Sequence, residues 1–141
     1  MQAAMGASLI TILIATIAGW LFGSLWYGAL GKRWMAATGL TEADVKGPNG
    51  KVDPSPFVIS FVLEFVMAYV LAVLLLHTSD GAFSLGSALM AAFILWLGFV
   101  FTTQTVNHRY SMKPWSLTVI DGGHWLGVLL IQALVMAMMG L

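Results

Sequence analysis

Three ionisable side chains lie within long apolar stretches of this sequence, and they are the residues best suited to chemistry. Glu64, Asp121 and His124 each have mainly apolar neighbours along the chain. Acidic residues inside a membrane-spanning segment usually face the protein interior or water, because exposing them to lipid costs a few kcal/mol or more. Carboxyl and imidazole groups can share or relay a proton. Their oxygen and nitrogen atoms also suit a divalent metal ion.

Polar residues also close the third apolar stretch, where Thr103, Gln104 and Asn107 precede His108 and Arg109. Their hydroxyl and amide groups would add hydrogen-bond donors and acceptors to a site built from carboxylates. The sequence contains no cysteine, no Gly-rich phosphate loop, no nucleophile elbow and no HExxH zinc motif. It therefore favours a non-enzymatic protein, without excluding an enzyme. It predicts no cofactor and leaves a metal site resting on residue types alone.

Four long apolar stretches must position these side chains. Of the 141 residues, 60% are hydrophobic and 9% are charged, whereas soluble domains carry roughly 25% charged residues. The stretches are continuous, and each reaches the ~20 residues that a helix needs to cross ~30 Å of hydrocarbon. We expect an all-α membrane protein with one domain over residues 1–141 and four transmembrane helices in an antiparallel bundle. The predicted helices span about residues 7–29, 57–76, 83–106 and 115–140.

The basic residues predict the orientation of this bundle. All six fall into two of the connections: Lys32, Arg33, Lys46 and Lys51 before the second helix, and Arg109 and Lys113 before the fourth. With four crossings, both connections lie on one side of the membrane, and Lys and Arg near helix ends favour the cytoplasmic side. We therefore expect both termini, and the short turn at Ser79-Asp80-Gly81, to lie outside. The basic residues are too few and too scattered to indicate nucleic-acid binding.

This orientation gives each polar residue an expected depth. Counting ~1.5 Å per residue from the cytoplasmic helix ends, Glu64 lies about 10 Å, Asp121 about 9 Å and His124 about 14 Å into the membrane. The polar end of the third helix lies at a similar level. We expect six side chains to converge in the cytoplasmic third of the bundle: Glu64, Asp121, His124, Asn107, Gln104 and Thr103.

The long connection over residues 30–56 has room for structure of its own. Thr41 followed by Asp44 is typical of a helix start, with Thr41 as the N-cap and the acidic residue three positions later. A short helix over 41–46 is therefore predicted in this cytoplasmic loop.

Small residues at helical spacing indicate close packing between helices. Helix 1 carries Ala15, Gly19 and Gly23, and helix 4 carries Gly123 and Gly127. These residues fit contacts within one four-helix bundle, and they also fit the interface of a homo-oligomer. We expect an oligomer, with membrane lipids as the other partner.

The first helix contains Gly23-Ser24-Leu25-Trp26-Tyr27-Gly28 and is followed by Trp34, and the later helices carry Glu64, Asn107-His108-Arg109 and Ile120-Asp121-Gly122. In these elements the chain resembles a bacterial family of small integral membrane proteins described only as a domain of unknown function. The resemblance covers essentially the whole chain and implies four helices and a bacterial inner membrane. It implies no activity and no site residues.

Two functions remain open from the sequence. In the first, the protein binds or conducts a small solute, proton or cation through the polar cluster. In the second, it is a structural or lipid-interacting membrane protein whose polar residues only hold the helices together.

Overall fold

A computed structural model describes residues 7–80 and 82–141, and this part of the chain is all-helical, as predicted. Gly81 of the predicted turn lies outside the described residues. Within these described residues, six elements are α-helical and one, η1, is a π-helix. In chain order they are α2 (Leu9–Thr38), α3 (Glu42–Val45), α4 (Ser55–Thr78), α5 (Leu85–Leu95), η1 (Trp96–Phe101), α6 (Thr102–Tyr110) and α7 (Trp115–Met139).

In the part of the chain that the structure describes, four helical spans are long and apolar enough to cross a membrane: Leu9–Thr38, Ser55–Thr78, Leu85–Tyr110 and Trp115–Met139. Large apolar side chains cover their outer surfaces, and Leu25 is 75% exposed. A surface this apolar is suited to lipid rather than to water. The fold therefore fits an integral, multi-pass membrane protein.

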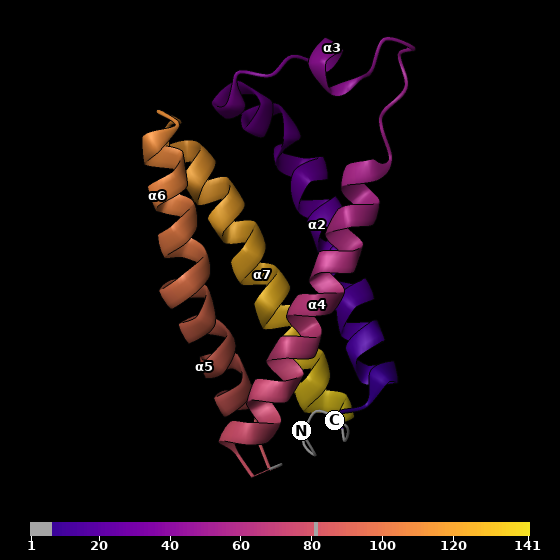
Figure 1. Cartoon of the computed structure of the whole chain (residues 1–141), viewed down its shortest axis with the longest axis vertical. Coiled ribbons are helices and arrows are strands. Elements are labelled where there is room, and N and C mark those ends of the chain that lie inside the picture. Colours follow the sequence, from indigo (N-terminus) through magenta and orange to yellow (C-terminus); the bar gives the residue numbers. More distant parts are fainter. Residues whose placement is uncertain (1–6, 81) are drawn as a thin grey trace.

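Consecutive spans run in opposite directions (Figure 1). The start of α2, the end of α7 and the connection between α4 and α5 lie at one end of the molecule, and α3 and the turn from α6 to α7 lie at the other. Helix α7 packs mainly against α2 and α5, and α4 packs mainly against α2. Although they are consecutive, α4 and α5 touch only sparsely.

The first span is longer than its apolar run. Its predicted end near residue 29 is wrong, because α2 continues to Thr38. Lys32 and Arg33 interrupt the apolar pattern, but both are good helix formers. Gly39 ends the helix with φ 81°, and its backbone N–H donates to the carbonyl of Met35. Glycine adopts this left-handed conformation at little steric cost.

The connection that follows contains the short helix α3 with the expected N-cap. The Thr41 side chain accepts a hydrogen bond from the backbone N–H of Asp44, and the Asp44 side chain accepts one from the N–H of Thr41. This reciprocal capping box satisfies backbone donors at the helix start.

The third span runs from Leu85 to Tyr110 rather than over 83–106, and the sequence did not predict its π-helical segment η1. A π-helix has more residues per turn than an α-helix, so it changes the direction in which all later side chains point. Hydroxyl groups after it bond carbonyls four residues earlier: Thr102 donates to Gly98 at 2.8 Å and Thr105 donates to Phe101 at 2.6 Å. These bonds satisfy carbonyl groups around the irregular turns.

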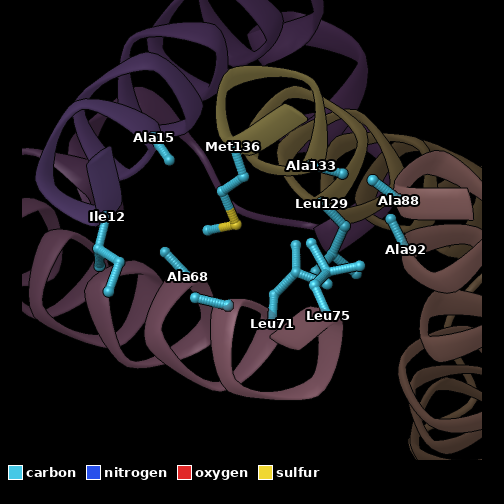
Figure 2. Packing of buried hydrophobic residues seen from close by; sticks show 11 residues of the cluster. Ile12, Ala15, Ala68, Leu71, Leu75, Ala88, Ala92, Leu129, Ala133 and Met136 are labelled. Atoms are coloured by element: carbon cyan, nitrogen blue, oxygen red, sulfur yellow. The ribbon is translucent and has the colours of Figure 1, made fainter. Parts of the chain in front are cut away.

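The apolar core lies away from α3, where α2, α4, α5 and α7 meet. Figure 2 shows Met136 of α7 pointing between α2 and α4, near Ile12, Ala15 and Ala68. All four residues are fully buried. Alanine side chains allow the helix backbones to approach closely at this point.

The predicted small-residue positions pack inside the single chain. A Cβ atom at Gly123 would lie 2.8 Å from the Trp26 ring, and one at Gly127 would lie 2.3 Å from the Phe22 ring. Gly19 and Gly23 are buried on α2 and face α7 in the same way. These glycines serve the α2–α7 contact, so a homo-oligomer would need a different surface.

Candidate functional site

Asp121 on α7 contacts the helices on both of its sides. Its Oδ1 atom accepts a hydrogen bond of 2.7 Å from the hydroxyl of Tyr27 on α2. Its Oδ2 atom lies 3.7 Å from Nε2 of His108 on α6. The carboxylate is only partly buried. It can therefore accept further hydrogen bonds from the open side.

Two tryptophans fix the backbone of α7 around this carboxylate. Nε1 of Trp26 donates to the carbonyl of Ile120 at 2.9 Å, and Nε1 of Trp96 donates to the carbonyl of Gly122 at 2.8 Å. Trp26 belongs to α2 and Trp96 begins η1. The residues before and after Asp121 are thus held from two different helices, which restricts the direction of its side chain.

The hydroxyl of Thr118, one turn before Asp121, organises the neighbouring basic residues. Its Oγ1 atom accepts a hydrogen bond of 3.0 Å from Arg109 and lies 2.9 Å from Nδ1 of His108. A guanidinium group only donates hydrogen bonds, so the Thr118 hydroxyl can donate its own hydrogen bond to Nδ1 of His108. In that arrangement the proton of a neutral His108 ring is on Nε2, the atom that faces Asp121.

A polar pocket of about 380 Å³ opens beside Asp121, between α6 and α7. Its polar and aromatic lining consists of Thr103, Gln104, Asn107, His108, Asp121 and Trp125. Four of the six predicted site residues are therefore brought together. They meet because α6 and α7 are joined by a short turn over residues 111–114, so that residues at similar distances from the turn face each other.

His124 lies beside this pocket rather than in it. The ring is 5% exposed, and its centroid is 4.9 Å from that of Tyr27 and 4.6 Å from that of Trp125. A Cβ atom at Gly23 would lie 2.7 Å from Nε2. Among the described residues, Nδ1 of His124 has no hydrogen-bond partner. The His124 ring thus packs against Tyr27 and Trp125, two side chains of the site.

Glu64 does not join the other predicted residues. It is 1% exposed, and it faces α7 at Gln132, whose amide donates to the Glu64 carbonyl at 3.1 Å. A Cβ atom at Gly19 would lie 3.2 Å from Oε2 of Glu64. Gln132 follows Asp121 by three helical turns, about 16 Å along α7. Counting residues from each helix start gave the wrong level for Glu64, because α4 and α7 are inclined to each other (Figure 1).

The separation of the predicted residues also bears on the metal interpretation. Over residues 7–80 and 82–141, no group of three or more His, Asp or Glu side chains is arranged to hold a metal ion. Asp121 and His124 share Tyr27 as a neighbour, but Glu64 on α4 contacts α7 at Gln132, well away from both.

Tyr27, Thr118 and Trp125 belong to the site but were not predicted from the sequence. For Tyr27 the signal depends on the length of α2: with the helix predicted to end near residue 29 the hydroxyl lies close to that end, whereas with the observed end at Thr38 it lies about 16 Å along the helix from the end. A phenol hydroxyl at that distance from a helix end needs a partner within the protein. Thr118 and Trp125 lie on the same face of α7 as Asp121, three positions before it and four after it. Neither residue type by itself indicates a site.

No curated protein and no solved structure matches this chain. A family model described as "Protein of unknown function (DUF1761)" matches residues 10–137. This match covers all four of the membrane-spanning helices almost completely. The chain therefore belongs to the DUF1761 family of proteins of unknown function.

Proposed function

We propose that this integral membrane protein binds a small cation, an ammonium ion in particular, in the pocket beside Asp121. The observation that carries the proposal is the charge of the lining. Among the described residues, Asp121 is the only carboxylate that lines the pocket, and no Lys or Arg lines it. A cation in this pocket would gain a charge-assisted hydrogen bond or ion pair with the carboxylate.

Neighbouring groups also suit an ammonium ion. The ring of Trp125 lines the same pocket, and an indole face attracts cations through its quadrupole. Gln104, Asn107 and Thr103 line the same pocket. An ammonium N–H group can donate to amide and hydroxyl oxygens.

The distribution of Lys and Arg supports an orientation for the proposed site. Arg109 and Lys113 lie at the end of the molecule that also holds α3. With the basic connections in the cytoplasm, the pocket would open toward the cytoplasmic side of a bacterial inner membrane. The cation would then enter from the cytoplasm.

Isothermal titration calorimetry of the purified protein in detergent tests the proposal. Ethylammonium is expected to bind, while acetate and ethanol, which have similar size, do not. Asp121→Asn is expected to weaken ethylammonium binding about ten- to a hundredfold, because a hydrogen bond to a charged group contributes about 1.5–3 kcal/mol. Asp80→Asn removes a carboxylate at the opposite end of the molecule and serves as the matched control. Equal affinities of wild type and Asp121→Asn would contradict the proposal.

One observation favours a structural role as the second candidate. Asp121 lies between Tyr27 of α2 and His108 of α6, so it also stabilises contacts between helices. In that case wild type binds no ethylammonium, and Asp121→Ala, which removes the acceptor for Tyr27, lowers the temperature of unfolding. Ethylammonium binding by wild type thus separates the two functions.

A further inference from the structure

The polar pocket adjoins a second, apolar pocket. The second pocket has a volume of about 250 Å³ and lies between α4, the α5–η1 segment and α7. Val100 of η1 lines both pockets. Val100 therefore forms part of the wall of each cavity, close to where the π-helix changes the direction of the helix surface.

The surface of α7 shows the same change from polar to apolar. Asp121 and Trp125 line the polar pocket, and Leu129 lines the apolar one. Residues four positions apart share one face of a helix, so these three form a single stripe of about 12 Å along α7. The polar end of the stripe is nearer the turn to α6, with Arg109 near the end of α6 and Lys113 in the turn. The apolar end lies nearer the middle of the span.

The apolar pocket is open to the side rather than enclosed. Val66 and Val70 of α4 are each 49% exposed, and Phe99 of η1 is 69% exposed. Helices α4 and α5, which both line the pocket, touch only sparsely. An apolar chain could therefore enter from the surrounding lipid without crossing a polar surface.

We propose that the occupant of the two pockets is an amphiphile with an ammonium head group and an aliphatic chain. The head group would lie against Asp121 and Trp125, and the chain would lie against Val70, Phe99 and Leu129. A lipid-derived molecule has this order of groups, with its charged head near the membrane surface and its chain toward the middle of the bilayer. This inference rests on the proposed cation site and adds the class of molecule that carries the cation.

Photolabelling tests where the chain lies. The probe is dodecylammonium with a diazirine at the end of its alkyl chain, added to wild-type protein in phosphatidylcholine nanodiscs. We expect labelled peptides to contain the Val66–Val70 segment, Phe99 or Leu129, and excess dodecylammonium to suppress the label. Asp121→Asn is expected to reduce this labelling about tenfold or more, through the lost charge-assisted bond. Labelling spread over all lipid-facing residues, or unaffected by the competitor, would overturn the inference.

A matched pair of tryptophan substitutions tests the apolar pocket itself. Val70→Trp fills the pocket and is expected to remove the labelling, while its ethylammonium affinity stays that of wild type. Val62→Trp adds the same side chain two turns earlier on α4, at an exposed residue that does not line the pocket. It is expected to leave both measurements unchanged. Retained ethylammonium binding also shows that each variant is folded.

The outcomes separate this inference from the proposed function. If ethylammonium binds but the chain labels no specific site, the cation site stands and the amphiphile is wrong. If wild type does not bind ethylammonium, the cation site itself is wrong. Specific labelling that Asp121→Asn does not reduce would show an apolar site without the ammonium head group, which also contradicts the inference.

Discussion

The hydroxyl of Tyr27 donates a hydrogen bond of 2.7 Å to Oδ1 of Asp121, and this bond joins α2 to α7 across 94 positions of the chain. The other carboxylate oxygen faces His108 of α6. Asp121 is thus both the charged group of the pocket and a link between three helices. Substitutions that keep one of these roles and remove the other can separate them.

Tyr27→Phe removes the hydroxyl and leaves the ring in place. We expect the free energy of unfolding to fall by about 1 kcal/mol, since a buried hydrogen bond contributes about that much in water and in membranes. Thermal unfolding in detergent, followed by tryptophan fluorescence, measures the change. Tyr110→Phe is the control, because Tyr110 is 87% exposed. Equal melting temperatures for the two variants would argue against the Tyr27–Asp121 bond.

Gly23→Ala tests the close approach of α2 and His124. The new methyl group would lie 2.7 Å from Nε2, so the ring or the helix must move. Such overpacking costs about 1–3 kcal/mol of stability. Gly28→Ala is the matched control, because nothing lies within 4 Å of a Cβ atom there. Its stability is expected to be unchanged or higher by up to about 1 kcal/mol, since alanine favours helix. The contact would be disproved by Gly23→Ala unfolding at the same temperature as Gly28→Ala.

Glu64→Gln tests whether the ionised form of this buried residue is needed. Over the described residues, Oε2 of Glu64 and Oε1 of Gln132 have no hydrogen-bond partner. The amide introduced at position 64 can donate where a carboxylate cannot. We therefore expect Glu64→Gln to be at least as stable as wild type in thermal unfolding, with the exposed Glu42→Gln as control. A loss of more than about 1 kcal/mol would instead show that the carboxylate is stabilising.

The capping box of α3 predicts a pH dependence outside the membrane-spanning helices. Hydrogen bonds from the hydroxyl and then the backbone N–H of Thr41 hold the pKa of Asp44 below its ordinary value of 3.8. The pKa of Asp44 is lower in the folded protein than in the unfolded chain. The capping box therefore stabilises α3 fully at pH values above the unfolded pKa, and this stabilisation is lost as the pH falls through the folded pKa.

Carbon NMR titration of the Asp44 carboxyl group checks this prediction. Thr41→Val is expected to raise the midpoint of the titration toward 3.8, and Thr38→Val is expected to leave it unchanged. An unchanged midpoint in Thr41→Val would show that the capping bonds do not control this pKa.

Much of the fold followed from the sequence, because continuous apolar runs of this length have few alternatives to membrane-spanning helices. The end of α2 did not follow. Apolar character stops near Ala29, whereas the helix stops only at Gly39, where the backbone conformation changes. The π-helix η1 did not follow either, because no residue pattern distinguishes it from the α-helix around it.

The site was predicted in part for a related reason. Asp121, Asn107 and Gln104 lie close to the same short turn, so their distances along the chain were a good guide to their positions. Glu64 lies on a helix that is inclined to α7 and packs mainly against α2, and its position depends on that inclination. Its burial was predicted correctly, but not its neighbours.

The ratio of the ethylammonium dissociation constants of Asp121→Asn and wild type tests the central claim most directly. An asparagine at this position can still accept the hydrogen bond from Tyr27, so the variant is expected to melt close to the wild-type temperature. The predicted ratio is about ten to a hundred, with a ratio of one for Asp80→Asn. A ratio of one for Asp121→Asn, measured on folded protein, would contradict the cation site.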